Sequence, residues 1–439
     1  MDDINRSAGS HRAIKHGAPD KPLPGPRADA RHGLEGLRVA LVHDWLTGMR
    51  GGEKCLEVLC RAFPQATLYT LIHRRGSTSP AIESMAIRTS PLQRVPGVFR
   101  HYRHLLPLMP MAAASWRLRN VDLVVSLSHC VAKSVRVPAG VPHVCYCFTP
   151  MRYAWDGRDA YLAGWAHRPV RKAIAGTLLD RLRTWDHATA RRVTQFVAIS
   201  RTIRERIASC YHRDSVIIPP PVDTEFYGEL PDPPPPREAF YLVVSALVPY
   251  KRIDQAVAAC TRLGRELVVI GAGPERARLQ AIAGPTVRFL GWQSDEVIRD
   301  HYRRCRALLF PGEEDFGIVP IEALACGAPV IALGRGGVPE TVDDAVGRVY
   351  REPSAEGLQA AILGWEEDGC PHRPALGRSR AESFALPLFG ERLLTLLSGT
   401  VTTSRPVITS PSLHGPHLPS PRDESRRASV RSDAARTDR

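Results

Sequence analysis

The segment ALLFPGEEDFGIVPIEALACGAPVIA, residues 307–332, decides the fold. It begins with an apolar strand at 307–310, continues through a loop and an apolar helix, and ends in a second apolar strand at 329–332. Pro320 suits the first helical position and Gly327 the helix exit, because proline favours helix starts and glycine favours helix ends. We therefore predict a strand–helix–strand unit whose two strands run parallel.

The same alternation continues on both sides of this segment. Further strands are predicted by short apolar runs at 39–43, 121–126, 143–148, 196–199, 215–218, 241–245, 267–270 and 287–290. Strands that alternate with helices imply parallel sheets, in which ligands bind at the carboxyl ends of the strands. The proline-rich stretch 228–238 predicts a stiff linker, so we expect two such units with a ligand cleft between them.

The positive charge of the chain is unevenly placed. The formal net charge of +14 comes from 53 arginines and 6 lysines against 45 acidic residues. Residues 37–240 hold 28 basic and 16 acidic residues, whereas residues 241–400 hold 18 and 20. The basic first half suggests a face that meets an anionic partner. A GC-rich coding sequence is an alternative reason for the arginine excess itself.

Composition excludes several classes of protein. With 44% hydrophobic residues the chain can bury large cores, and its 439 residues allow two or three domains. The ten cysteines form no Cys-x-x-Cys pair, which argues against a zinc site or a disulfide framework and fits a reducing cytoplasm. No apolar run approaches the roughly 18 residues of a membrane span, and the first 36 residues lack the hydrophobic block of a secretory signal.

Two carboxylates in the opening segment suggest a sugar site. Glu314 lies in the loop after a strand, and Glu322 follows after seven intervening residues, near the start of the helix. Carboxylates can accept hydrogen bonds from vicinal sugar hydroxyls, and free N–H groups near Phe316 and Gly317 can hold phosphate oxygens. Alternatively, acidic residues near a helix start merely favour the helix dipole, which would explain either glutamate but not the whole pattern.

This segment resembles the E-x7-E signature of retaining glycosyltransferases with the GT-B fold, the family 4 group. Other matching segments are HDWLTGMRGGE at 43–53, YCFTPMRYAW at 146–155, PPPVDT at 219–224 and VPYKRID at 248–254. They look like a bacterial polysaccharide branch whose members are often mannosyltransferases. The resemblance spans about residues 37–398, most of the chain.

The resemblance implies an α/β protein with two Rossmann-like domains. We expect a disordered tail at 1–36, an acceptor domain at 37–233, a nucleotide-sugar domain at 234–383, a helix at 384–400 that returns toward the first domain, and a disordered Ser/Pro/Arg-rich tail at 401–439. The donor would be a nucleotide-diphosphate sugar, for which we expect GDP-mannose, bound as substrate with no metal and no further cofactor.

The resemblance also assigns roles to particular residues. Lys251 matches the diphosphate-binding lysine, Glu322 would bind the ribose and Glu314 the transferred sugar; Glu314 and Lys251 are the catalytic candidates. A front-face retaining mechanism would follow, with the donor phosphate helping to deprotonate the acceptor. The remaining donor-binding candidates are Gly51, Gly52, Arg252, Gly271, Gly273, Phe316, Gly317 and Ile318.

Two positions depart from the family pattern. Ala246 stands where the family usually has an arginine, so one diphosphate cation is absent unless Arg252 or another cation replaces it. Phe148 stands where a histidine typically lines the site, and phenylalanine can neither donate a hydrogen bond nor carry charge. His129 and His143 are nearby candidates for its role, with a structural role as the alternative for each.

The segment 98–111 mixes cations, aromatic rings and long apolar residues, and Trp116, Arg117 and Arg119 follow it. It suits a surface that dips into anionic lipid headgroups, or else a half-buried segment with arginines at its rim. The family's acceptors are often polyprenyl-diphosphate-linked saccharides, so we expect a lipid-linked or saccharide acceptor and a cytoplasmic protein at the inner face of the cell membrane. Nucleic acid is disfavoured, because the chain has no recognised binding motif.

Three functions remain open from the sequence. The first is an active retaining glycosyltransferase in cell-surface polysaccharide synthesis. The second is a catalytically impaired homologue that binds a nucleotide sugar or a partner, which Ala246 and Phe148 favour and intact Lys251, Glu314 and Glu322 oppose. The third is a nucleotide-sugar epimerase on the same two-domain plan.

Overall fold

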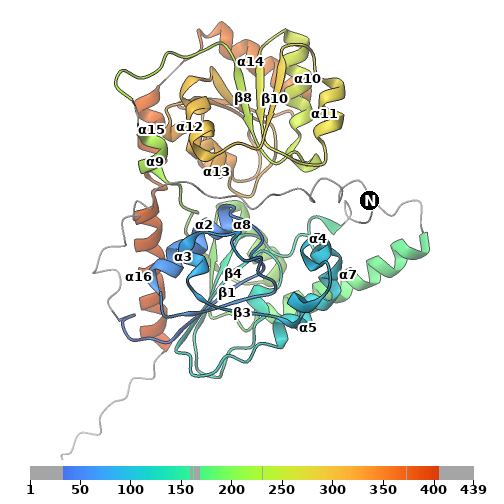
Figure 1. Ribbon diagram of the computed structural model, residues 1–439, viewed down its shortest axis with the longest axis vertical. Coiled ribbons are helices and arrows are strands. Elements are labelled where there is room, and N and C mark those ends of the chain that lie inside the picture. The colour runs from blue at the N-terminus through green and yellow to red at the C-terminus, as the bar shows by residue number, and fades with distance from the viewer. Residues whose placement is uncertain (1–32, 159–161, 163–168, 230, 372, 405–439) are drawn as a thin grey trace, which may run out of the picture. The chain divides into compact units, whose positions relative to one another are not determined.

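The computed structural model in Figure 1 describes residues 33–158, 162, 169–229, 231–371 and 373–404. Most of the two expected tails therefore lies outside the described residues. Leu34 and Val401 are buried, so the packed part of the chain includes a few residues that we had assigned to the tails.

The first sheet has seven parallel strands within the described residues, in the order β3-β2-β1-β4-β5-β6-β7. They are β1 (Val39–His43), β2 (Thr67–Thr70), β3 (Ala86–Thr89), β4 (Leu123–Ser128), β5 (His143–Cys147), β6 (Gln195–Ala198) and β7 (Ser215–Ile217). The accompanying helices are α2 (Gly51–Ala62), α3 (Pro80–Glu83), α4 (Val98–His101), α5 (Met109–Ala114), α7 (Pro169–Ala190), α8 (Arg201–Tyr211) and α9 (Thr224–Gly228), with the 3-10 turns η3 (Pro91–Arg94), η4 (Tyr102–Leu108) and η5 (Ala132–Ser134).

The second sheet has six parallel strands in the same described part of the chain, in the order β10-β9-β8-β11-β12-β13. They are β8 (Tyr241–Val244), β9 (Leu267–Ile270), β10 (Val287–Gly291), β11 (Ala307–Phe310), β12 (Val330–Leu333) and β13 (Gly347–Tyr350). The helices are α10 (Ile253–Leu263), α11 (Arg276–Ile282), α12 (Asp295–Arg304), α13 (Ile318–Ala325), α14 (Ala355–Glu367), α15 (Pro374–Glu382) and α16 (Leu386–Ser404), with η6 (Pro249–Lys251) and η7 (Val338–Glu340).

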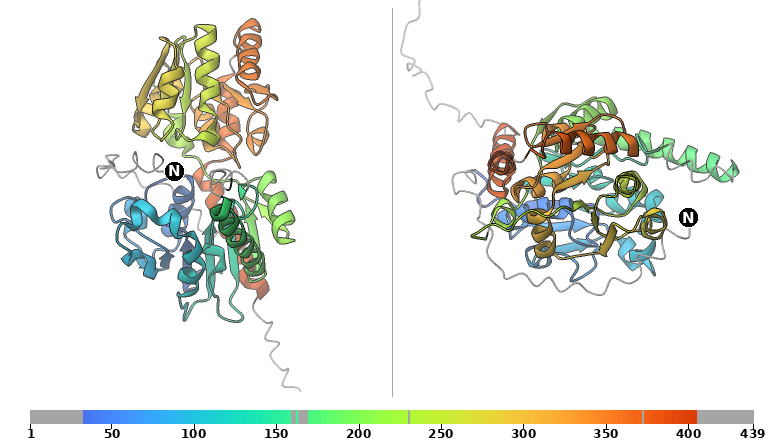
Figure 2. Two further views of the ribbon diagram at one scale, coloured as in Figure 1. Left: turned by 90° about the vertical axis from the view of Figure 1, so that its right-hand side faces the viewer. Right: turned by 90° about the horizontal axis from the view of Figure 1, so that it is seen from above.

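Helices cover both faces of each sheet (Figures 1 and 2). The period of two along a strand explains this arrangement, because successive side chains point to opposite faces. In β1, Val39 and Leu41 enter one hydrophobic cluster, whereas Ala40 and Val42 enter another. The central strands, such as β1 and β11, are buried on both sides, as is typical of parallel sheets, and the predicted Rossmann-like architecture of both domains is confirmed.

None of the helices in the described residues combines the length and apolarity needed to span a bilayer. The opening segment forms β11, α13 and β12 as predicted, and Gly327 follows the helix in the left-handed region at φ +77°. Pro320 is the third helical residue rather than the first, because the helix begins at Ile318. A missing N–H is harmless in the first turn of a helix.

Candidate functional site

The loop after β11 carries Glu314 and leads into the N-terminus of α13. Gly317 precedes the helix at φ +89°, a conformation that favours glycine. Gly317 has no side chain that could cap this end of α13, and no side chain in the described part of the protein accepts a hydrogen bond from its first N–H groups. A helix N-terminus in this state attracts anions such as phosphate. The structure thus places Phe316, Gly317 and Ile318 at the N-terminus of α13, and their role in holding an anion stays a prediction.

Lys251 and Glu314 meet although 62 residues separate them. Lys251 ends η6, just after β8, and β8 and β11 are neighbours in the sheet. The Lys251 ammonium contacts the Glu314 carboxylate directly, and it lies 5.5 Å from the centre of the Tyr250 ring. A cation and a carboxylate are therefore held together at the strand ends, where parallel sheets bind ligands.

A loop that the sequence did not single out fixes Glu314. Gly337 N–H donates to the Glu314 carbonyl at 2.8 Å, and a Cβ on Gly336 would lie only 2.2 Å from that carbonyl oxygen. Gly336 also has a positive φ of +64°. The two adjacent glycines after β12 thus let this loop press against the Glu314 loop. In the sequence, the run GRGG at 334–337 could have indicated this close contact.

Glu322 is buried on α13, and polar side chains approach its carboxylate. Lys54 Nζ and the Tyr302 hydroxyl each donate to its carboxylate at 3.3 Å. Burial opposes charge on Lys54, but Glu322 and Asp295 outweigh it and raise the pKa of the Lys54 amine. Sequence reasoning missed Lys54, although it directly follows the Gly51-Gly52-Glu53 segment.

Gly51 and Gly52 begin α2, which also lacks a side-chain cap. A Cβ on Gly51 would lie 2.7 Å from Ile318 Cδ1, and one on Gly52 would lie 3.3 Å from the Phe148 ring. A side chain at position 51 would therefore require Ile318 to shift. The two uncapped helix N-termini, of α2 and α13, meet at this contact, which supports the predicted grouping of Gly51 and Ile318.

Gly271 and Gly273 have an internal reason to be glycine. A Cβ on Gly271 would lie 1.8 Å from the Ser245 carbonyl oxygen, and one on Gly273 would lie 2.2 Å from that of Leu247. Leu247 N–H also donates to the Ala272 carbonyl at 3.0 Å. Because the loops after β8 and β9 run against each other, the structure explains both glycines without a ligand, and their donor-binding role stays a prediction.

Arg252 does not join Lys251. Its backbone is left-handed at φ +53°, and its guanidinium lies 3.9 Å from the Asp254 carboxylate, with about half of the side chain exposed. Arg152, from the loop after β5, approaches instead. It pairs with Asp315 at 2.6 Å, and its guanidinium lies 6.0 Å from the centre of the Tyr250 ring that Lys251 also faces. Burial opposes the charge, but Asp315 raises the pKa of Arg152, with Glu314 contributing.

Comparison with known proteins agrees with this geometry. Residues 49–226 match the model described as Glycosyltransferase Family 4, and residues 231–382 match that of Glycosyl transferases group 1. The GDP-mannose-dependent alpha-(1-6)-phosphatidylinositol monomannoside mannosyltransferase of Mycolicibacterium smegmatis is 30% identical over 270 residues, which cover 54% of this chain and 67% of that protein. The chain belongs to glycosyltransferase family 4. It is a hexosyltransferase with the GT-B fold.

Other relatives match shorter parts of this glycosyltransferase. The GDP-mannose-dependent monoacylated alpha-(1-6)-phosphatidylinositol monomannoside mannosyltransferase of Corynebacterium glutamicum is 30% identical over 172 residues, 35% of this chain and 45% of that protein. Among solved structures, Anabaena HepE in complex with UDP has a TM-score of 0.62 at 16% identity and covers 83% of this chain and 100% of its own. Sucrose-phosphate synthase from Thermosynechococcus elongatus has a TM-score of 0.61 at 18% identity, and the match covers 84% of this chain and 100% of that protein. At these identities the structures show the fold alone.

The glycosyltransferase's two candidate histidines differ sharply. His143 is fully buried within β5, with its Nε2 2.8 Å from Ser126 Oγ. Burial, with a smaller contribution from Lys133, lowers the pKa of His143 to about 3, so the ring is neutral and internal. His143 is therefore structural. His129 follows β4, and about a third of its side chain is exposed.

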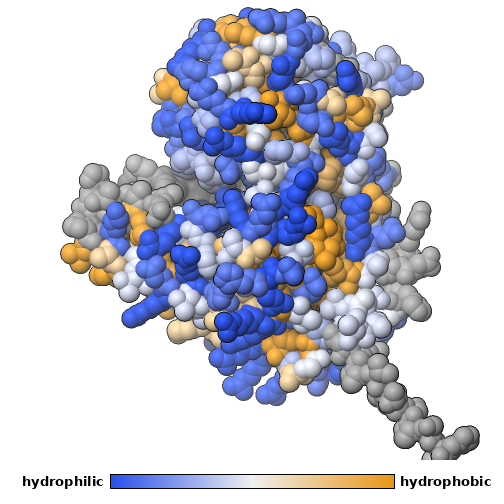
Figure 3. Space-filling model, turned by 180° about the vertical axis from the view of Figure 1, so that it is seen from behind, coloured by the Kyte–Doolittle hydropathy of each residue, from blue (hydrophilic) through white to orange (hydrophobic). Residues whose placement is uncertain are grey.

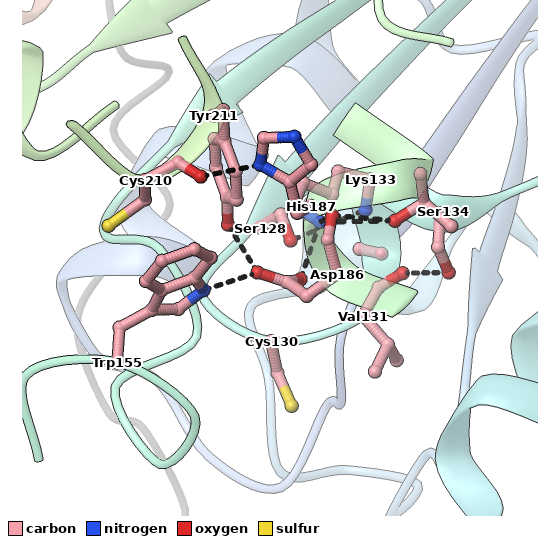
Figure 4. Close-up of polar contacts among 12 residues, drawn as sticks. Ser128, Cys130, Val131, Lys133, Ser134, Trp155, Asp186, His187, Cys210 and Tyr211 are labelled. Carbon is pink, nitrogen blue, oxygen red and sulfur yellow. Dashed lines mark hydrogen bonds and ion pairs between the residues drawn. The ribbon is translucent and has the colours of Figure 1, made fainter. Parts of the chain in front are cut away.

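A buried ion pair lies beneath these strand ends in the glycosyltransferase (Figure 4). Lys133 Nζ lies 2.5 Å from one oxygen of Asp186, and both side chains are almost fully buried. The other Asp186 oxygen accepts hydrogen bonds from Trp155 Nε1 at 2.9 Å and the Tyr211 hydroxyl at 2.7 Å. The contacts of this ion pair hold together η5, α7, α8 and the loop that carries Arg152.

Proposed function

We propose that this glycosyltransferase moves mannose from GDP-mannose to a lipid-linked or saccharide acceptor, with retention at the anomeric carbon, in cell-surface polysaccharide synthesis. The contact between Lys251 and Glu314, beside the uncapped N-terminus of α13, carries the proposal. It combines a cation and free N–H groups for a diphosphate with a carboxylate for sugar hydroxyls. The GDP-mannose-dependent relatives support the choice of donor.

In the proposed reaction, Lys251 and the α13 N–H groups hold the donor diphosphate. Glu314 accepts hydrogen bonds from the hexose, and Glu322 accepts them from the ribose. The bond from the anomeric carbon to the phosphate oxygen breaks as the bond to the acceptor oxygen forms on the same face. The acceptor proton passes to the departing phosphate oxygen, whose growing negative charge Lys251 stabilises. No metal or further cofactor takes part, so a chelator should leave the rate unchanged.

We also propose that the N-terminal domain contacts an anionic membrane at the inner face of the cell. Leu108 and Met111 are 45% and 70% exposed near α5, and Val170 and Ile174 are 72% and 65% exposed on α7. Parts of η4, α5 and α7 pack into one hydrophobic cluster and so cover the same face of the first sheet. Exposed apolar side chains beside basic ones suit a headgroup layer.

Seen from behind the view of Figure 1, the surface of the molecule has patches of hydrophobic residues that are separated by hydrophilic ones (Figure 3). Sedimentation with phosphatidylglycerol vesicles tests the membrane contact. Met111→Glu with Ile174→Glu should weaken binding several-fold, whereas Trp292→Glu, at an exposed residue just after β10, should not. Equal binding of all three proteins would contradict it.

A second candidate is a catalytically impaired homologue that binds a nucleotide sugar or a partner. Ala246 is exposed and carries no charge, and Phe148 occupies the place next to Gly52. A donor screen with purified protein and a lipid-linked saccharide acceptor separates the two candidates. The transferase proposal expects turnover with GDP-mannose. Binding without transfer or hydrolysis, followed by recovery in Ala246→Arg with Phe148→His, would favour the impaired homologue.

A further inference from the structure

The carboxyl ends of β1, β4 and β5 bring together residues outside the donor site just described. These three strands are consecutive in the sheet. Their registers pair His43 with Leu127 and Ser128 with Cys147, so the residues that follow the strands, Asp44, His129 and Phe148, lie within one residue of the same level at the edge. Parallel sheets bind ligands at this edge, so this cluster is a candidate for contact with substrate.

Asp44 is rigidly fixed. It is fully buried, and its two oxygens accept the backbone N–H groups of four successive residues, 129–132, at 2.7–2.9 Å. These four hydrogen bonds hold both carboxylate oxygens in place. Asp44 therefore offers a fixed carboxylate to the side chain that lies next to it.

His129 lies against this carboxylate. Its Nδ1 is 3.1 Å from Asp44 Oδ2, and the Trp45 ring meets it edge-on with the ring centres 4.4 Å apart. The neighbouring carboxylate favours the tautomer with the proton on Nδ1, which leaves Nε2 as a hydrogen-bond acceptor. Within the described part of the chain, no side chain or backbone group hydrogen-bonds to Nε2, although 31% of the side chain is exposed.

The His129 ring also borders the contact between the two helix N-termini. The rings of His129 and Phe148 have centres 6.4 Å apart, and Phe148 packs against Gly52. Gly51 in turn touches Ile318 of α13. His129 is therefore separated from the donor-binding helix by Phe148 and the start of α2.

We propose that His129 is a substrate-binding residue, whose Nε2 accepts a hydrogen bond from a sugar hydroxyl and whose ring Asp44 positions. The hydroxyl belongs either to the transferred hexose or to the acceptor saccharide. The inference rests on the proposed function and names a contact of the same site. A fixed, oriented acceptor contributes to binding because it needs little reorganisation when substrate arrives.

The primary test is His129→Phe, which keeps a ring and removes both nitrogens. We expect kcat/KM for transfer to fall roughly 10- to 100-fold, the range for a lost substrate hydrogen bond. His73→Phe is the matched control, because His73 is likewise a histidine ring 3.1 Å from a carboxylate, that of Glu83, elsewhere in the same domain. Thermal unfolding confirms equal folded fractions. Transfer by His129→Phe within twofold of wild type would overturn the inference.

Two assays identify the source of the hydroxyl. If it belongs to the hexose, acceptor-independent hydrolysis of the donor falls together with transfer. If it belongs to the acceptor saccharide, hydrolysis is unchanged and the KM for acceptor rises. Either result supports the inference. His129→Gln, which retains an acceptor atom, and Phe148→His in the His129→Phe background should each recover part of the loss.

A pH profile separates binding from a structural role. Burial lowers the pKa of His129, with His43 and Arg50 acting the same way and Asp44 and Glu53 opposing them. Wild-type kcat/KM should therefore fall as the pH drops below the ordinary histidine value of 6.5 and the ring protonates. His129→Phe should lack this acid limb. A variant with reduced activity that keeps the limb would overturn the inference.

A binding measurement keeps the outcome independent of turnover. Failure of the proposed function would appear as no transfer by the wild-type protein from any nucleotide sugar. Calorimetry with methyl α-mannoside and with an α-linked mannose disaccharide would still decide the inference. Wild-type binding that weakens several-fold in His129→Phe and not in His73→Phe supports it; equal affinities, or no binding by wild type, contradict it.

Discussion

The strand ends of the two sheets are held in place by different means. In the second sheet, loops press backbone against backbone, and glycines at 271, 273, 336 and 337 leave no room for a Cβ. In the first sheet, buried charges hold the edge: Asp44 binds four N–H groups, and Lys133 pairs with Asp186. The donor side is thus built from several short loops that are braced by contacts between their backbones. The opposite side is assembled from distant segments around fixed charges.

The largest effect is expected on the donor side. Glu314→Gln removes the charge that faces Lys251 and one acceptor for hexose hydroxyls, so kcat/KM for transfer should fall about 10²- to 10³-fold. Glu313→Gln, an exposed neighbour in the same loop, should stay within about threefold, in the range of ordinary surface changes. Steady-state kinetics with GDP-mannose measures both. Similar losses in the two variants would show that loop charge in general matters and Glu314 in particular does not.

The strand ends of the first sheet, which buried charges hold in place, should lose stability when one of these charges is removed. Lys133→Met leaves Asp186 buried without its cation, so the free energy of unfolding should fall by about 3–5 kcal/mol. Urea denaturation measures this change. Lys172→Met, on the exposed start of α7, should cost less than about 0.5 kcal/mol. If Lys133→Met were no more harmful than Lys172→Met, the buried pair would not be what holds this edge.

The two neighbouring cations after β8 should differ. Lys251→Met should lower kcat/KM about 10²-fold, since a cation aimed at the leaving diphosphate is lost. Arg252→Met should lower it less than fivefold, because Arg252 faces Asp254 and Lys251 faces Glu314. Equal losses in both variants would place Arg252 at the diphosphate after all.

The smallest expected effect is a loss of stability in the loops of the second sheet, where backbone packs against backbone. Gly273→Ala places a Cβ against the Leu247 carbonyl, so stability should fall by about 1–3 kcal/mol, the usual cost of overpacking. Gly399→Ala is the matched control, because nothing lies within 4 Å of its Cβ and it sits within α16. That change should stabilise by up to about 1 kcal/mol. Thermal unfolding compares them, and a neutral Gly273→Ala would remove the structural explanation for this glycine.

This contrast also explains what the sequence could predict. The donor residues lie in short motifs near the ends of predicted strands, so the sequence could assign Lys251 and Glu314 to one site, although it did not predict their direct contact. The cluster of Asp44, His129 and Phe148 depends on β1, β4 and β5 being neighbours, which the order of segments along the chain does not reveal. Arg152 lay inside a quoted motif, but its pairing with Asp315 required the folded loops.

The anomeric configuration of the product tests the central claim most directly. The donor mannose in GDP-mannose is α-linked, so a retaining transfer gives an α-mannoside. NMR of the product formed from ¹³C-labelled GDP-mannose and a lipid-linked saccharide acceptor reads the configuration from the anomeric coupling. The account predicts an α-linked mannose, lost in Glu314→Gln; a β-linked product, or transfer that survives Glu314→Gln unchanged, would contradict it.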